Sequence, residues 1–150
     1  MLRISKMADY ATVIMVYLAR NQQTLANVKT IANATHISEP TVSKLLKRLT
    51  KAQLLESQRG AVGGYRLKCP AQSISVARII SVIEERTGLT ECSFGHSDCS
   101  IQAVCTLQGN WQLINRAIET ALDSVSLADL AKPNLTLGNI PIVTKELPIE

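Results

Sequence analysis

Residues 38–51 carry the pattern that most restricts the fold of this chain. Four apolar residues repeat at the spacing i, i+3, i+4, i+7, which predicts a helix with one buried face: Val42, Leu45, Leu46 and Leu49. Four cations repeat at the same spacing, about 200° around that helix: Lys44, Lys47, Arg48 and Lys51. Ser38 is a good N-cap residue, and Pro40 falls in the first turn, where a missing N–H costs nothing. We therefore expect a helix with one core face and one cationic face.

A glycine-rich hairpin is expected directly after this helix. Residues 54–58 and 64–68 are typical of short strands, and the loop between them contains Arg59, Gly60 and Gly63. Two amphipathic helices, over about 5–20 and 27–34, precede the basic helix. This order predicts a mainly α fold with a small β-hairpin, in the arrangement of a winged helix-turn-helix.

Charge is concentrated in the same region. The net charge is +4 overall, but residues 44–68 hold seven cations and one anion, whereas residues 69–150 have a net charge of −4. Such a block is the footprint of a phosphate-binding surface, although a solvated helix face is an equally simple interpretation. The sequence has only five aromatic residues, and proteins that bind single strands use several as stacking platforms. Duplex DNA is therefore the better candidate partner.

The second half of the chain predicts a long C-terminal helix. From residue 107 its apolar residues follow the 4-3-4-3-4 spacing of a heptad seam: Leu107, Trp111, Ile114, Ile118, Ala121 and Val125. The seam favours dimerisation through this helix, and packing on the chain's own core is the alternative. A fourth helix starting at Ser73 or Ser75, a loop over 88–105 and a turn over 126–130 complete the prediction. We divide the chain into a DNA-binding region (1–70), a region of the same unit with the cysteine loop and dimerisation helices (71–132), and a tail (133–150).

Several classes of protein are disfavoured. The best apolar run, residues 11–19, is far shorter than the roughly 18–20 residues that span a bilayer, and no signal peptide is recognisable. We expect a cytoplasmic protein with no membrane partner. An enzyme is also disfavoured, because there is no phosphate-binding glycine loop, no pair of carboxylates on one helix, and no nucleophile–base–orienter set.

The four cysteines fall into two groups. Cys69 stands alone and is expected to be a small buried residue. Cys92, Cys99 and Cys105 are spaced C-x6-C-x5-C within the expected loop. This spacing lacks the tight pairs of structural zinc sites, and an odd number of thiols argues against disulfides. It favours an iron–sulfur cluster, while zinc, metal-free redox thiols and plain loop cysteines stay open. A nucleophilic cysteine would need a base, and nothing obvious orients the nearby His96.

Five stretches together resemble one known family: "MLRISKMADYA", "ISEPTVSKLLKRLTKAQLL", "SQRGAVGGYRL", "ISVARIISVIEE" and the three cysteines followed by Trp111. The chain resembles the winged-helix regulators that include IscR and NsrR and, within them, the regulators of SUF iron–sulfur assembly systems. The resemblance covers residues 1 to about 132. It implies a homodimeric transcription regulator, expected to be a repressor of iron–sulfur assembly genes, whose affinity for a pseudo-palindromic operator follows the state of a [2Fe-2S] or [4Fe-4S] cluster.

The resemblance also implies the site residues. Cys92, Cys99 and Cys105 match the cluster ligands, while Gln108 replaces a histidine that completes the site in some relatives. The fourth ligand is therefore open, with Asp9 of the partner subunit preferred over His96, Asp98 or solvent. The residues expected to contact DNA lie on the basic helix and the wing: Ser38, Glu39, Thr41, Ser43, Lys44, Lys47, Arg48, Lys51, Arg59 and Tyr65.

Two other functions are consistent with the residues. One is a winged-helix regulator that uses its cysteines as metal-free redox thiols. The other is a protein-interaction module whose basic block binds an acidic partner instead of DNA.

Overall fold

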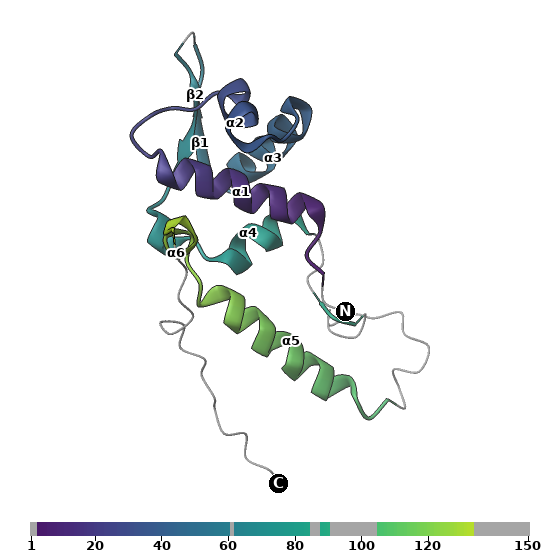
Figure 1. Cartoon of the computed structure of the whole chain (residues 1–150). Helices are drawn as coiled ribbons and strands as arrows, with labels where there is room; N and C mark the ends of the chain where they lie inside the picture. The colour runs from purple at the N-terminus through teal and green to yellow at the C-terminus, as the bar shows by residue number, and fades with distance from the viewer. Residues whose placement is uncertain (1–2, 61, 85–87, 91–104, 134–150) are drawn as a thin grey trace.

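The computed structural model describes residues 3–60, 62–84, 88–90 and 105–133. The elements within these ranges are α1 (Lys6–Arg20), α2 (Val28–Thr35), α3 (Glu39–Lys51), β1 (Leu55–Gln58), β2 (Gly64–Leu67), the 3-10 turn η1 (Ala71–Ser73), α4 (Val76–Ile83), α5 (Gln108–Asp123) and α6 (Leu127–Ala131) (Figure 1). The mainly helical fold with one β-hairpin is confirmed.

The first three helices form the expected helical head. Ser5 caps α1 by accepting a hydrogen bond from the Ala8 amide, and Asn27 caps α2 by accepting one from the Thr30 amide. The apolar stripes of α1 and α3 are fully buried against each other and against Ile31 of α2. After α2 the chain turns sharply at His36, whose φ of 57° lies in the left-handed region. This turn directs α3 away from α2.

The wing is a two-stranded antiparallel hairpin with a third backbone segment beside it. Glu56 lies opposite Arg66 in the register, and the two side chains form an ion pair. On its other edge β2 pairs with Ala26, because the Tyr65 amide donates to the Ala26 carbonyl at 2.9 Å and the Ala26 amide donates to the Tyr65 carbonyl at 3.1 Å. A side chain at Gly64 would lie 2.8 Å from the Ala26 backbone. Glycine at 64 therefore permits this close approach.

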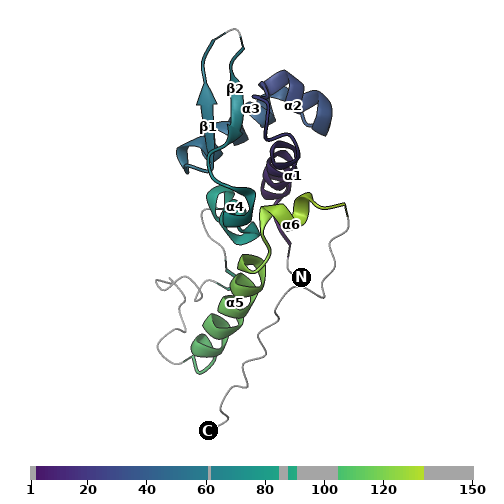
Figure 2. The ribbon, with the colours of Figure 1, turned by 90° about the vertical axis from the view of Figure 1, so that its left-hand side faces the viewer.

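The helix α4 lies between the head and α5 (Figure 2). Its buried residues are those of the predicted stripe: Val76, Ile79, Ile80 and Ile83. The start of α4 is joined to the segment between α5 and α6, because the Val76 amide donates to the Val125 carbonyl and the Leu127 amide donates to the Ile74 carbonyl. The core therefore runs continuously from α1 through α3 and α4 to Leu127.

The segment expected as a turn over 126–130 is instead the short helix α6. Ser126 and Asp129 form a capping box, in which each side chain bonds the other residue's backbone amide. Lys132 also donates to the Asp129 carboxylate at 2.7 Å. Hydrogen bonds from Lys132 and Ser126 lower the pKa of Asp129 to about 2. Local capping thus allows a helix in a stretch that appears too short for one.

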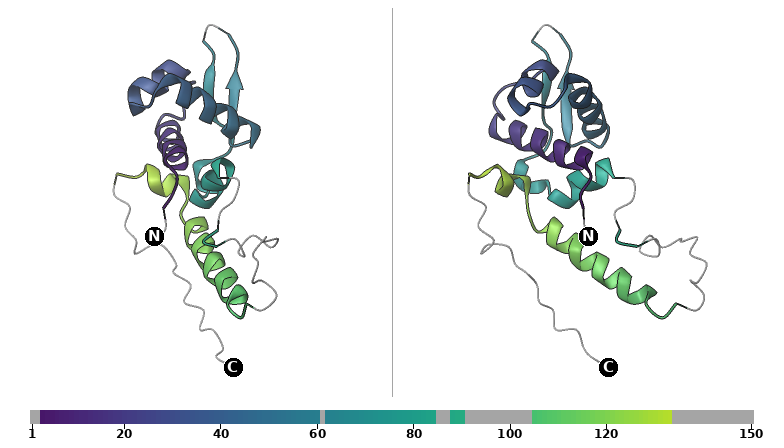
Figure 3. Two further views of the ribbon diagram at one scale, coloured as in Figure 1. Left: turned by 90° about the vertical axis from the view of Figure 1, so that its right-hand side faces the viewer. Right: turned by 45° about the vertical axis from the view of Figure 1, so that its right-hand side comes forward.

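The helix α5 extends away from the head, as all views show (Figures 1, 2 and 3). Its bounds agree with the predicted long helix, but the predicted seam divides into two rows. Trp111, Ile118 and Val125 are half-buried, and Val125 packs against the chain's own core. Leu107 and Ile114 are 53% and 44% exposed, and Ala121 is exposed as well. Within the described part of the chain, no helix is both long and apolar enough to cross a lipid bilayer.

Candidate nucleic-acid interface

The basic face of α3 is presented to solvent. Lys44, Lys47 and Lys51 are exposed, while the four apolar residues on the opposite side are completely buried. Burial of that face holds the helix axis in place, so the exposed ammonium groups stand on a rigid element. This arrangement suits a surface that meets a row of phosphates.

Arg48 differs from its three basic neighbours. Its side chain is half-buried, and its Nη2 donates to the backbone carbonyl of Val82 in α4 at 3.2 Å. The sequence pattern grouped Arg48 with the lysines, because spacing around one helix does not reveal a contact with another helix.

The start of α3 carries short polar side chains. Ser38 occupies the N-cap position as expected, but its hydroxyl makes no capping bond to the backbone. Instead the Ser38 Oγ lies 2.9 Å from the Thr41 Oγ1, and either hydroxyl serves as the donor. Glu39 is exposed, and Thr41 and Ser43 are partly exposed. These groups are accessible at the end of the helix that enters a groove in helix-turn-helix proteins.

The wing projects at the same end of the molecule as α2 and α3 (Figure 1). Arg59 is exposed at the start of its loop, and Val62 is 89% exposed. Arg66 is paired with Glu56, and Tyr65 is half-buried against the core while its backbone bonds Ala26. Among these wing residues, Arg59 is therefore the exposed cation that lies in the loop, whereas the charge of Arg66 is paired with that of Glu56.

The cysteine residues are only partly described by the structure. Cys105 lies three residues before α5 and is half-exposed, whereas Cys92, Cys99, His96 and Asp98 lie outside the described residues. Asp9 is exposed in the first turn of α1. The described ranges contain no cluster of three or more metal-ligating side chains. Cys69 is exposed, so the expectation of a buried role for it was wrong.

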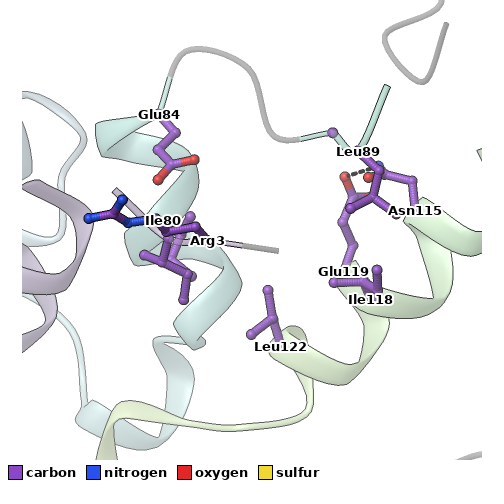
Figure 4. Close-up of a pocket in the computed structure, with 10 residues that line it drawn as sticks. Arg3, Ile80, Glu84, Leu89, Asn115, Ile118, Glu119 and Leu122 are labelled. Atoms are coloured by element: carbon purple, nitrogen blue, oxygen red, sulfur yellow. Dashed lines mark hydrogen bonds between the residues drawn. The ribbon is translucent and has the colours of Figure 1, made fainter. Parts of the chain in front are cut away.

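A hollow of about 310 Å³ lies between α4, α5 and the N-terminal segment. Figure 4 shows Arg3, Ile80 and Glu84 on one side of it and Ile118 and Leu122 of α5 on the other. Its wall also includes Asn115, a buried residue whose Nδ2 donates to the Glu119 Oε1 at 2.8 Å. The hollow adjoins Glu84, where α4 ends and the chain continues toward the cysteines. Spacing alone gave no sign of this hollow, because Glu84 and α5 border it only through the fold.

Comparisons with known proteins agree with this geometry. The family model Rrf2, described as iron-dependent transcriptional regulator, matches residues 4–133. The regulator NsrR of Oceanobacillus iheyensis is 33% identical over 136 residues, which cover 87% of this chain and 90% of that protein. The regulator IscR of Vibrio campbellii is 30% identical over 137 residues, which cover 91% and 81%.

A solved structure shares the fold as well. The structure of CymR, the global cysteine regulator of B. subtilis, superposes with a TM-score of 0.70 at 32% identity and covers 87% of this chain and 97% of that one. These relatives are transcription regulators and not enzymes. The winged helical head, the basic α3 and the match over almost all described residues lead to one conclusion: the chain belongs to the Rrf2 family of DNA-binding transcription regulators.

Proposed function

We propose that this protein is a cytoplasmic, homodimeric repressor that binds a pseudo-palindromic operator and is controlled by an iron–sulfur cluster. Iron–sulfur assembly genes are the proposed targets, because the sequence resembles regulators of those genes. The observation that carries the DNA-binding part is the exposed lysine row of α3 beside the wing.

The proposed DNA contacts fall into two groups. Lys44, Lys47 and Lys51 bind phosphates and supply the affinity and its salt dependence. Base edges are read by four side chains at the start of α3: Ser38, Glu39, Thr41 and Ser43. Arg59 enters the minor groove from the wing, with Tyr65 beside it.

The second copy of the chain is proposed to pack on the exposed side of α5. Leu107, Leu113 and Ile114 are each more than two-fifths exposed, and Ala117 and Ala121 lie on the same side. A helix that is apolar on two sides has buried only one of them within its own chain. Two heads joined in this way address half-sites about 34 Å apart, one turn of the double helix.

The cluster is proposed to be held by Cys92, Cys99 and Cys105, with Asp9 of the partner subunit as the fourth ligand. The donor chemistry fits, because thiolates are the usual ligands of such clusters and carboxylates also bind iron. The half-exposed Cys105 thiol lies next to the helix that we assign to the dimer. A bound cluster would make the protein sensitive to iron and to oxidants, because the presence of the cluster depends on both.

Anaerobic purification followed by visible spectroscopy and iron and sulfide analysis tests this proposal. We expect bound iron and sulfide in the wild-type protein, their loss in Cys92→Ala, and a change in operator affinity in parallel. Cys69→Ala is the matched control, because Cys69 is exposed and lies outside the trio. Its iron content should equal that of the wild type. Equal operator affinities of the loaded protein and of Cys92→Ala would rule out cluster control.

Metal-free redox control is the second candidate. It is favoured by one relative, CymR of Staphylococcus aureus, whose solved structures include an oxidized form at 30% identity. A colourless, iron-free protein after anaerobic reconstitution, with DNA binding that responds to a thiol oxidant, would support it. Failure to bind duplex DNA, together with binding of an acidic protein that weakens as salt is raised, would support the interaction module instead.

A further inference from the structure

The hydrogen bond from Arg48 to Val82 joins α3 to α4 through two residues that are 34 positions apart in the sequence. Val82 lies in the last turn of α4, where backbone carbonyls have no partner further along the helix. That end of a helix also carries a partial negative charge, so a guanidinium is favoured there both as a donor and as a cation. The Arg48 side chain therefore connects the basic helix to the C-terminal end of α4.

The same end of α4 is held by a second contact. The Ser5 amide donates to the Glu84 Oε1 at 2.9 Å, and Ser5 is the N-cap of α1. The end of α4 is thus attached to α3 through Arg48 and to α1 through Glu84. In the sequence, Glu84 is followed by the stretch that contains Cys92 and Cys99.

We propose that Arg48 is a positioning residue that sets α3 against the end of α4 and so transmits displacement of that end to the DNA-contacting face. This inference rests on the proposed DNA-binding function, and it assigns Arg48 a role other than phosphate neutralisation. Its half-buried side chain distinguishes it from the exposed lysines that share its helix face. A shift at the junction between α4 and the cysteine stretch would reach α3 through this bond, without any contact between cysteines and DNA.

Salt dependence separates the two roles of Arg48. The probe is a duplex selected from a random-sequence pool by the wild-type protein, and its dissociation constant is measured from low to high salt. Lys47→Ala should reduce the slope of log affinity against log salt by about 0.9 for each protomer's phosphate contact that is lost. Arg48→Ala should weaken binding about tenfold and leave the slope unchanged. A slope that falls as in Lys47→Ala, or an unchanged affinity, would overturn the proposal.

For Glu84→Ala, simple electrostatics and the proposed positioning role predict opposite changes in DNA affinity. Removing a carboxylate from a DNA-binding protein favours binding by simple electrostatics. If the end of α4 positions α3, however, Glu84→Ala should weaken binding without changing the salt slope. Its effect should also be less than additive with that of Arg48→Ala, because both changes release the same helix end. Tighter binding by Glu84→Ala, or fully additive effects, would contradict the coupling.

Hydrogen exchange separates failure of this inference from failure of the proposed function. Exchange at the amides of the last turn of α4 should become about tenfold faster in Arg48→Ala than in Lys47→Ala, with or without DNA. If the wild-type protein binds no duplex DNA, the proposed function fails while this measurement still tests the contact. Equal exchange in the two variants would show that Arg48 does not hold the end of α4.

Discussion

Replacement of Gly64 by alanine tests the packing of the wing against the head. The new Cβ would lie 2.8, 2.9 and 3.0 Å from the backbone C, O and N atoms of Ala26. These atoms belong to a buried main-chain segment that cannot rotate away as a flexible side chain does. We expect the pairing between Tyr65 and Ala26 to open.

The size of the effect follows from the bonds that would be lost. Two backbone hydrogen bonds join Tyr65 and Ala26, and each contributes about 1 kcal/mol net. Alanine also reduces the entropy of the unfolded chain, which returns about 0.4–1 kcal/mol. Gly64→Ala should therefore lower the free energy of unfolding by about 1–2 kcal/mol. For a chain of this size the loss corresponds to a fall in Tm of about 2–8 °C.

Gly109→Ala is the matched control. Gly109 lies in the first turn of α5, and an added Cβ would meet nothing within 4 Å. The same substitution there should leave stability unchanged or raise it by up to about 1 kcal/mol, because alanine is the better helix former. Urea unfolding at one fixed protein concentration measures both variants, since the stability of a dimer depends on concentration. If Gly64→Ala is as stable as the wild type, or Gly109→Ala loses as much, the argument from close backbone approach is wrong.

Three further changes probe other parts of the molecule. Gln53, just after α3, has a φ of 65°, a conformation that glycine adopts more easily than glutamine. Gln53→Gly should therefore raise the free energy of unfolding, measured by urea titration, by about 0.5 kcal/mol. A lower free energy of unfolding would argue against backbone strain at this position. Hydrogen bonds from Lys132 and Ser126 lower the pKa of Asp129 to about 2, so the stability that the Asp129 carboxylate contributes should be complete above about pH 4 and be lost as the pH falls through 2. An NMR titration of Asp129 with a midpoint near the ordinary value of 3.8 would contradict these hydrogen bonds. Ile114→Glu places a charge on the exposed side of α5, where burial against a second subunit would be costly. Light scattering at micromolar concentration should therefore show a monomer. A dimer would locate the subunit contact elsewhere.

Much of the fold was predictable because its signals are local. Helical spacing identified the buried faces of α1, α3 and α4, and the glycines located the wing. The exposed row of Lys44, Lys47 and Lys51 also followed from spacing, since residues on the opposite side of a buried face must meet solvent. The short helix α6 was missed because its stability comes from a capping box in a five-residue segment.

Sequence periodicity determined which residues of each helix share a face, because that depends only on the turn of the helix. Only the tertiary structure decided what each face meets. It leaves Trp111 and Ile118 half-buried while Ile114 is exposed to solvent, although all three belong to one apolar seam. It likewise joins Arg48 to the end of α4 and leaves its lysine neighbours exposed. The physical reason is the same in both cases: contacts between helices depend on how the helices cross, and a repeat within one helix contains no information about its neighbours.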